Sequence, residues 1–232
     1  MQHTLITEET LLFLRALEEN NNREWFNDNK DRFKGLETGV KLFFSGILEG
    51  LKEHDNMEAM KVFRIYRDVR FSHDKSPYKG HFAASFSRLG AHNRGGYYIR
   101  IKPGASFVAV GFWQPNKEDL LRLRKEFQLD ASEFRDVVTE PSLVKIWGPL
   151  QGDELKTAPK GFDKEDPNID LIRKKQFLFV RNFTDQEVLS PTFREQVDHG
   201  FKAIRPYFDL MGSILTTDLN GVSLLDQGLH IK

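Results

Sequence analysis

The chain contains no cysteine among its 232 residues. Disulfides, thiolate nucleophiles, iron–sulfur clusters and cysteine-ligated zinc are therefore excluded, and any catalysis would depend on oxygen and nitrogen groups. Long apolar runs are also lacking, since no stretch approaches the roughly 18 consecutive apolar residues that a membrane span requires. The first residues resemble neither a signal peptide nor a transit peptide. These absences predict a cytoplasmic protein that has no membrane partner.

A net charge is missing as well, because 34 Lys and Arg residues balance 34 Asp and Glu residues. A dedicated DNA-binding protein usually has a basic domain average, so this balance argues against one. Tyrosine and tryptophan are few, at 5 and 3, whereas the 20 phenylalanines indicate a core built from that residue. A chain of this length and 39% hydrophobic content suits one domain spanning residues 1–232.

The first part of the chain, residues 1–55, is predicted to form a helical layer. Thr7 is a plausible N-cap, and the leucines that follow it recur at helical spacing. Asn20, Asn21 and Asn22 interrupt this pattern, and Asn22 is suited to cap a second helix. A third helix is predicted from about Leu36. Three helices therefore precede the first predicted strand.

Residues 60–114 change to a period of two, which predicts strands joined by tight turns. Gly90 to Gly96 and the Pro103-Gly104 pair supply the turn residues, and they indicate an antiparallel meander rather than a phosphate-binding loop. One face of this sheet is apolar. The opposite face is basic and aromatic, and it carries Arg64, Tyr66, His81, Tyr98, Arg100 and Lys102.

Residues 116–232 are predicted to mix helices with loops. Helices are expected at residues 116–127, 132–139 and 169–174, and strands at residues 143–147 and 176–183, with a loop-rich segment at residues 148–167. A last long helix starts at Ser190 or Thr192 and is kinked by Pro206. The predicted fold class is therefore α+β, with an antiparallel sheet, an N-terminal helical layer and a long C-terminal helix.

Positive charge is concentrated in residues 61–102, where ten Lys and Arg residues face two acids, a local balance of +8. Such a cluster indicates either a bound anion or a network of internal ion pairs with Asp68, Asp74 or acids of the first helices. Arginine favours planar phosphate or carboxylate groups because it binds them in a bidentate manner. The candidate ligand-binding residues are Arg64, Arg67, Arg70, Lys75, Tyr78, Lys79, Arg100 and Trp113.

The candidates for acid–base catalysis lie in the same segment and are Asp68, His73 and Asp74. Histidine titrates near neutral pH, and a neighbouring carboxylate can orient it. The alternative interpretation is that Asp74 or Ser72 binds local backbone N–H groups and fixes the turn that Pro77 completes. No metal site is predicted, because the histidines lack ligand spacing and the local field repels cations. No cofactor is predicted either.

Two further features have a functional and a structural interpretation. Trp113 ends a predicted strand and could stack a base or a sugar. Lys156, Lys160 and Lys164 form a second basic loop, which either closes over a ligand or is a solvated connection.

Four stretches of the sequence occur together in a specific order: N-N-N-R-E-W-F at 20–26, R-D-V-R-F-S-H-D-K-S-P-Y-K at 67–79, G-F-W at 111–113 and L-K-T-A-P-K-G-F-D at 155–163. In order and spacing they resemble a widespread bacterial family of conserved hypothetical proteins, a domain of unknown function of about this length. The resemblance implies a single compact domain, and it implies no particular activity.

Three functions of different classes follow from these observations. The first is a binding module whose basic sheet face holds an anionic small molecule, a nucleotide or a nucleic acid. The second is an enzyme that acts on a phosphoester or another anion, with arginines stabilising the developing charge. The third is a structural or partner-binding protein whose basic face meets an acidic protein. The oligomeric state stays open.

Overall fold

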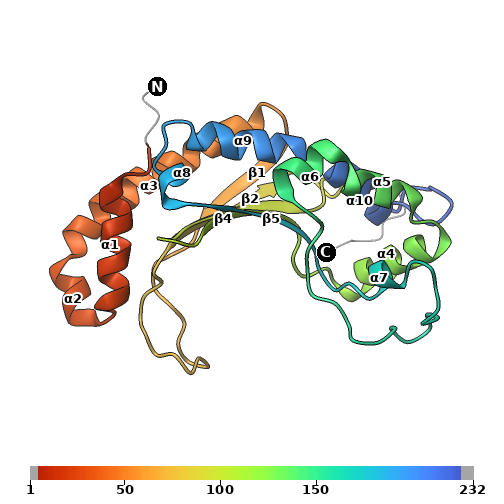
Figure 1. Cartoon of the computed structure of the whole chain (residues 1–232), viewed down its shortest axis with the longest axis horizontal. Helices are drawn as coiled ribbons and strands as arrows, with labels where there is room; N and C mark the ends of the chain where they lie inside the picture. Colours follow the sequence, from red (N-terminus) through yellow and green to blue (C-terminus); the bar gives the residue numbers. More distant parts are fainter. Residues whose placement is uncertain (1–4, 226–232) are drawn as a thin grey trace. The chain divides into compact units, whose positions relative to one another are not determined.

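The computed structural model describes residues 5–225, and the fold within them is α+β, as predicted (Figure 1). The helices are α1 (Glu8–Glu19), α2 (Arg23–Asp28), α3 (Lys30–Lys52), α4 (Lys117–Leu129), α5 (Ser132–Thr139), α6 (Pro141–Trp147), α7 (Ile169–Ile172), α8 (Asp185–Val188), α9 (Phe193–Ala203) and α10 (Arg205–Thr216). The strands are β1 (Met57–Val62), β2 (Phe82–Arg88), β3 (Gly96–Ile101), β4 (Ser106–Phe112) and β5 (Phe177–Phe183).

The strands form one antiparallel sheet with the order β1-β2-β3-β4-β5. Neighbours in the sheet are thus neighbours in the sequence, as a meander requires. Alternation is clearest in β3, where Tyr97, Ile99 and Ile101 are buried while Tyr98 and Arg100 are partly exposed. The predicted division into an apolar and a basic, aromatic face is therefore confirmed for β3.

Three helices precede the first strand, as predicted, and two of them begin at a capping side chain. The Thr10 N–H donates to Thr7 Oγ1 at 3.3 Å, and the Trp25 N–H donates to Asn22 Oδ1 at 2.9 Å. Such bonds satisfy backbone donors that the first turn of a helix leaves without a partner. The third helix begins at Lys30, earlier than the predicted start near Leu36.

The chain divides into two compact units. Unit 1 comprises Met1–Phe86, Tyr98–Val108 and Asn182–His199, and unit 2 comprises Ser87–Tyr97, Ala109–Arg181 and Gly200–Lys232. The boundaries cut β2, β3, β4 and β5, so each unit holds part of the sheet. That residues 1–232 form a single domain stays a prediction.

The core of unit 1 is built from phenylalanine. Phe33 of α3 stacks on Phe82 of β2 with ring centroids 5.9 Å apart, and Phe43 of α3 stacks on Phe193 at 5.6 Å. All of these side chains are buried. Helix α3 therefore covers the apolar face of the strands in this unit, and the buried rings account for much of its stability.

The core of unit 2 is also aromatic and includes a satisfied polar group. Tyr207 is fully buried, and its hydroxyl donates to the Phe177 carbonyl oxygen at 3.0 Å. Gly95 has a φ of +85°, and a Cβ at this position would lie 2.5 Å from the Phe208 ring. Both the backbone conformation and the close contact therefore require glycine here.

Three sequence-based predictions differ from the structure. Residues 143–147 belong to helix α6, not to a strand, because Pro141 occupies its first turn and the Glu140 side chain accepts from the Leu143 N–H at 2.9 Å. Strand β1 covers Met57–Val62, so it starts and ends earlier than predicted. The predicted kink at Pro206 is a break at Ile204 between α9 and α10.

None of the helices within residues 5–225 is both long enough and apolar enough to cross a membrane.

Candidate functional site

The segment between β1 and β2, residues 63–81, leaves the strands as a long loop (Figure 1). Its base is closed by backbone bonds: the Arg67 N–H donates to the Pro77 oxygen and the Lys79 N–H to the Ile65 oxygen, both at 2.8 Å. Tyr66 and Tyr78 form an isolated antiparallel bridge at this point. We call this segment the 63–81 loop.

Asn21, between α1 and α2, attaches the loop to the N-terminal helices. Its Nδ2 donates to the Tyr78 oxygen, and its Oδ1 accepts from the Tyr78 N–H, both at 3.0 Å. The Tyr78 ring is buried and stacks on Phe26 with centroids 4.0 Å apart. Tyr78, a predicted ligand residue, thus holds the loop in position through its backbone and its ring.

A cavity of about 280 Å³ lies at the base of the 63–81 loop and belongs wholly to unit 1. We call it the loop cavity. It is lined by Glu18, Asn21, Arg67, Asp74, Ser76, Tyr78, Lys79, Gly80, His81 and Lys102. Of the predicted ligand residues, it brings together Arg67, Tyr78 and Lys79.

The cations of the loop cavity differ in how their charge is balanced. Arg67 forms an ion pair with Asp74, and Lys102 pairs with Glu18 at 2.8 Å. The Lys79 ammonium donates to the Arg64 carbonyl oxygen at 2.9 Å, and within residues 5–225 it has no carboxylate partner. Burial, assisted by the Arg64 charge, lowers the pKa of Lys79. Lys79 therefore carries the least compensated charge of this cavity.

His81 responds to this positive environment. Burial, followed by the charges of Arg100, Lys79 and Lys102, lowers its pKa to about 4, while Glu18 opposes the shift. The imidazole is consequently neutral near pH 7, with one nitrogen able to donate and the other able to accept. An anion that entered the cavity would offset the cations and raise this pKa.

Asp74 is held by its own turn. Its Oδ1 accepts from the Ser76 N–H at 2.9 Å and the Ser76 hydroxyl at 2.6 Å, and its Oδ2 accepts from Arg67. These bonds, led by the Ser76 hydroxyl, keep the pKa of Asp74 far below its usual range. The carboxylate stays ionised near neutral pH and cannot donate a proton there. This geometry is the turn-fixing arrangement, which Pro77 completes.

The other predicted catalytic residues lie outside the loop cavity. Asp68 accepts from Arg70 Nε at 3.0 Å and Nη2 at 2.7 Å, which lowers the pKa of the carboxyl. The Arg70 side chain is 77% exposed, and His73 is exposed as well. Lys75 donates to the Val69 carbonyl oxygen at 3.0 Å. At the tip of the loop, the charged side chains of Asp68, Arg70 and Lys75 therefore bind partners within the loop itself.

The remaining candidates lie at three different places. Arg64 is exposed beside the base of the loop. Arg100 donates to the Ala105 oxygen at 2.9 Å and lies over the Phe107 ring at 4.2 Å from its centroid. Trp113 is 58% exposed and belongs to unit 2. Lys156, Lys160 and Lys164 are also exposed residues of unit 2.

Some lining residues were not among the predicted site residues. His81 and Lys102 were placed on the basic face by alternation, but they were not assigned to the site. Glu18 and Asn21 come from the N-terminal helices, and only the three-asparagine interruption marked that part of the sequence. Their approach to the loop depends on tertiary packing.

A row of aromatic rings crosses the sheet face opposite α3 in unit 1. The Phe63 and Tyr98 ring centroids are 6.1 Å apart, and those of Tyr98 and Phe107 are 5.6 Å apart. The Phe63 N–H donates to the Ala83 oxygen at 2.9 Å, which ties the first ring of the row to β2. We call Phe63, Tyr98 and Phe107 the aromatic row. All three are partly exposed.

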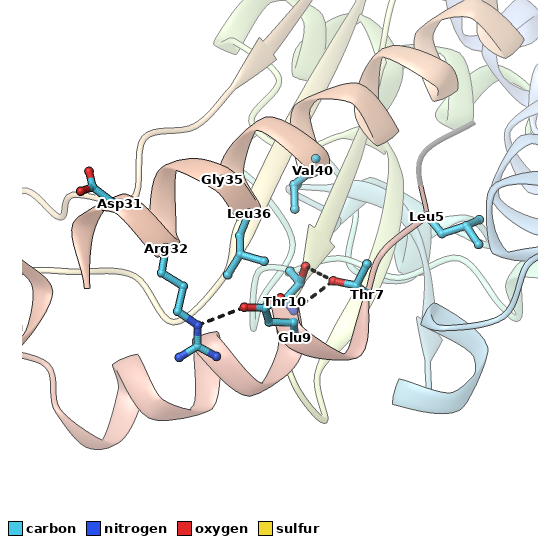
Figure 2. A pocket seen from close by; sticks show the side chains of 10 residues that line it. Leu5, Thr7, Glu9, Thr10, Asp31, Arg32, Gly35, Leu36 and Val40 are labelled. Carbon is cyan, nitrogen blue, oxygen red and sulfur yellow. Dashed lines mark hydrogen bonds and ion pairs between the residues drawn. The ribbon is translucent and has the colours of Figure 1, made fainter. Parts of the chain in front are cut away.

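A second cavity of unit 1, of about 420 Å³, lies between the start of α1 and α3 (Figure 2). Figure 2 shows that Arg32 points to Glu9, and the two side chains are 3.2 Å apart. Asp31 adds another negative charge to the lining. The single cation is therefore compensated, and this cavity does not suit an anion. Within residues 5–225, no group of three histidine or acidic side chains is placed to hold a metal ion.

Comparisons with known proteins bear on identity alone. No curated protein and no solved structure matches the chain. A family model described as a conserved hypothetical protein matches residues 9–210, which is most of the chain. The resemblance carried by the sequence is thus confirmed, and the chain belongs to the family of conserved hypothetical proteins DUF2461.

Proposed function

We propose that unit 1 binds an anionic ligand in the loop cavity. The supporting observation is the distribution of compensated and uncompensated cations in the segment 61–102. Within residues 5–225, Arg67, Arg70, Arg88, Arg94 and Lys102 have carboxylate partners. Across the described part of the chain, the cations of this segment without a carboxylate partner are Lys61, Arg64, Lys75, Lys79 and Arg100, and the last three donate to backbone carbonyl oxygens instead. Of this second group, Lys79 lines the cavity, and Arg100 acts on His81 inside it.

The lining offers an anion several donors of different kinds. The Lys79 ammonium supplies an uncompensated charge, and the neutral His81 supplies one N–H. Lys102 and Arg67 already bind carboxylates at the edge of the same cavity. A ligand anion would share these donors in a partly buried setting, where charge-assisted hydrogen bonds are stronger than in water.

Isothermal titration calorimetry with inorganic pyrophosphate tests this proposal. Lys79→Ala should weaken binding roughly tenfold or more, because it removes a charge-assisted hydrogen bond. Arg70→Ala is the matched control, since it removes one positive charge from the same loop outside the cavity lining. Equal affinities for the two variants, or no binding by the unmodified chain, would overturn the proposal.

The pH dependence of binding supplies a second test. A bound anion raises the pKa of His81 from about 4, so binding below pH 6.5 takes up a proton. Pyrophosphate affinity should therefore contain a His81 component that increases as the pH falls from 6.5 toward 4. Repeating the titrations in buffers of different ionisation enthalpy measures the proton uptake, and His81→Asn should abolish that component.

The other two functions stay predictions. An enzyme acting on a phosphoester would need a proton donor or acceptor in the cavity, and because Asp74 is committed to its turn, that role would fall to the neutral His81. A partner protein with an acidic surface would use the same uncompensated cations. Both would retain the cavity as the site of contact.

A further inference from the structure

The aromatic row and the loop cavity share one residue. Lys79 lines the cavity, and its ammonium also lies 5.7 Å from the centroid of the Phe63 ring. Lys61 lies 5.5 Å from the same ring, and Arg100 lies over Phe107 at the other end of the row. Uncompensated cations thus accompany the rings along the open sheet face of unit 1.

Rings suit planar bases and cations suit phosphates, and a nucleic acid contains both. Bases stack on aromatic side chains because every base has a π-face, and cations contact the phosphates between them. A duplex hides its base faces in its own stack, so a fixed row of rings cannot reach them. An acidic peptide requires the cations but gives the rings no comparable partner.

We propose that the ligand of this surface is a single-stranded nucleic acid. Its bases stack along the aromatic row and displace the cations that lie over Phe63 and Phe107. Those cations, Lys61, Lys79 and Arg100, then contact its phosphates, and one phosphate enters the loop cavity. The inference rests on the proposed function, because the same Lys79 anchors the anion in both.

The three rings form a platform that is already ordered, and binding moves only the cations that lie over Phe63 and Phe107. The Tyr98 ring lies 6.1 Å from the Phe63 ring and 5.6 Å from the Phe107 ring, centroid to centroid, and it is only partly exposed, so its neighbours hold it in place. Side chains that are already ordered lose less entropy on binding. The formal net charge of zero is consistent with a local binding surface, since the segment 61–102 alone carries a balance of +8.

Fluorescence anisotropy with a labelled oligothymidylate of roughly 12 nucleotides, a length within the usual site sizes, tests the inference. Tyr98→Leu and Phe107→Leu should each weaken oligonucleotide binding by about 5- to 150-fold, the range observed for loss of one base–ring stack. Their affinity for pyrophosphate should be unchanged. Phe71→Leu, which removes an exposed ring at the tip of the 63–81 loop, outside the row and outside the cavity lining, is the control and should bind like the unmodified chain. Thermal melting of each variant confirms folding.

Arg100→Gln provides a measurement that does not depend on the rings. Removing one phosphate contact should reduce the slope of log affinity against log salt by about 0.7. This variant keeps the sheet sequence otherwise intact, so it remains informative where a ring variant fails to fold. An unchanged salt slope would contradict phosphate contact at this end of the row.

The possible outcomes separate the two proposals. Ring variants that bind the oligonucleotide normally, while Lys79→Ala weakens pyrophosphate binding, would overturn the nucleic-acid inference and leave the anion site in place. Equal affinity for a duplex of the same length, or for polyglutamate, would also overturn it, the second result in favour of an acidic protein partner. No effect of Lys79→Ala on pyrophosphate would instead remove the proposed function itself.

Discussion

The basic segment 61–102 is one stretch of sequence, but its two parts use their charge in opposite ways. In unit 1, Lys79 and Arg100 have no carboxylate partner within residues 5–225 and lie beside partly exposed rings. In unit 2, Arg88 is only 1% exposed in its side chain, and Arg94 pairs with the buried Asp119. The same residue types therefore serve a candidate binding surface in one unit and internal packing in the other.

Acids that are distant in the sequence cause the difference. Asp119 and Asp209 belong to α4 and α10, and they meet Arg94 and Arg88 only after folding. Arg88 also lies over the Phe208 ring, with 4.9 Å between the guanidinium carbon and the centroid. In unit 1, the two acids of the loop pair with Arg67 and Arg70, which leaves none for Lys79. Local charge density alone cannot distinguish these two situations.

The largest effect on stability is expected in unit 2, where Arg94 pairs with a buried acid. Arg94→Ala leaves Asp119, which is 8% exposed, without its partner, and it should lower the free energy of unfolding by roughly 3 kcal/mol. Burial raises the pKa of Asp119, so the deficit should shrink as the pH falls and the carboxyl becomes neutral. Urea denaturation at two pH values measures both effects.

Arg64→Ala is the matched control for this prediction. It removes an exposed guanidinium that has no carboxylate partner within residues 5–225, and it should change the free energy of unfolding by less than about 0.5 kcal/mol. Similar losses in Arg94→Ala and Arg64→Ala would remove the contrast between the two units.

The next largest effect on the free energy of unfolding is expected from the protonation of His81. Its pKa of about 4 lies below the unfolded value of 6.5, so the unfolded chain binds the proton more tightly in the interval between them. The stabilisation from the neutral imidazole is complete above pH 6.5 and is lost as the pH falls toward 4, by about 1 to 2 kcal/mol once solvent screening is included.

The comparison of His81→Asn with the unmodified chain isolates this contribution. Denaturant unfolding between pH 4 and pH 7 should show a shallower dependence on pH in the variant. Parallel curves would mean that neither burial nor the nearby cations lower the pKa of His81 in the folded chain.

A smaller effect, this time on binding, is expected when a cation of the cavity loses its carboxylate partner. Glu18→Gln removes the partner of Lys102, which lies 2.8 Å away, and it should strengthen pyrophosphate binding about two- to fivefold, the scale of a partly exposed ion pair. Glu49→Gln, which breaks an exposed pair with Lys52 in α3, is the control. Weaker binding by Glu18→Gln would indicate that Glu18 organises the cavity rather than competing with its ligand.

The smallest effect is expected at the tip of the loop. Arg70→Ala breaks an exposed pair with Asp68 and should leave the denaturation midpoint unchanged, since such pairs contribute little to folding. The pKa of Asp68, now lowered first by the Arg70 side-chain hydrogen bonds, should rise part of the way toward its ordinary range, because the backbone N–H of residue 70 still donates to the carboxylate; an NMR titration can follow this rise. A shifted midpoint would show that the tip supports the fold.

Much of the fold could be predicted because local patterns and tertiary contacts agree. Alternation in β3 placed Tyr98 and Arg100 on the basic face, and the caps Thr7 and Asn22 marked the starts of two helices. The strand predicted at residues 143–147 was wrong because a short apolar run suits either a strand or a buried helix. The signal that decides was present in Glu140 and Pro141, a cap followed by a first-turn proline.

The candidate site was harder to predict, because its residues come from separate parts of unit 1. Arg67 and Lys79 belong to the predicted basic segment, whereas Glu18 and Asn21 reach the cavity from the N-terminal helices. Which cations keep uncompensated charge depends on these distant partners. Spacing along the chain does not contain that information.

The two hydrogen bonds from Asn21 to Tyr78 have a practical consequence for protein engineering. They fasten the base of the 63–81 loop, so the tip, where Phe71 is 96% exposed, can be lengthened with little strain elsewhere. Closing a longer loop costs only about 0.6 kcal/mol for each doubling of its length. A peptide tag or fluorescent reporter sequence inserted after Phe71 would therefore label the protein beside the candidate site while α1, α2 and the sheet keep their arrangement within unit 1.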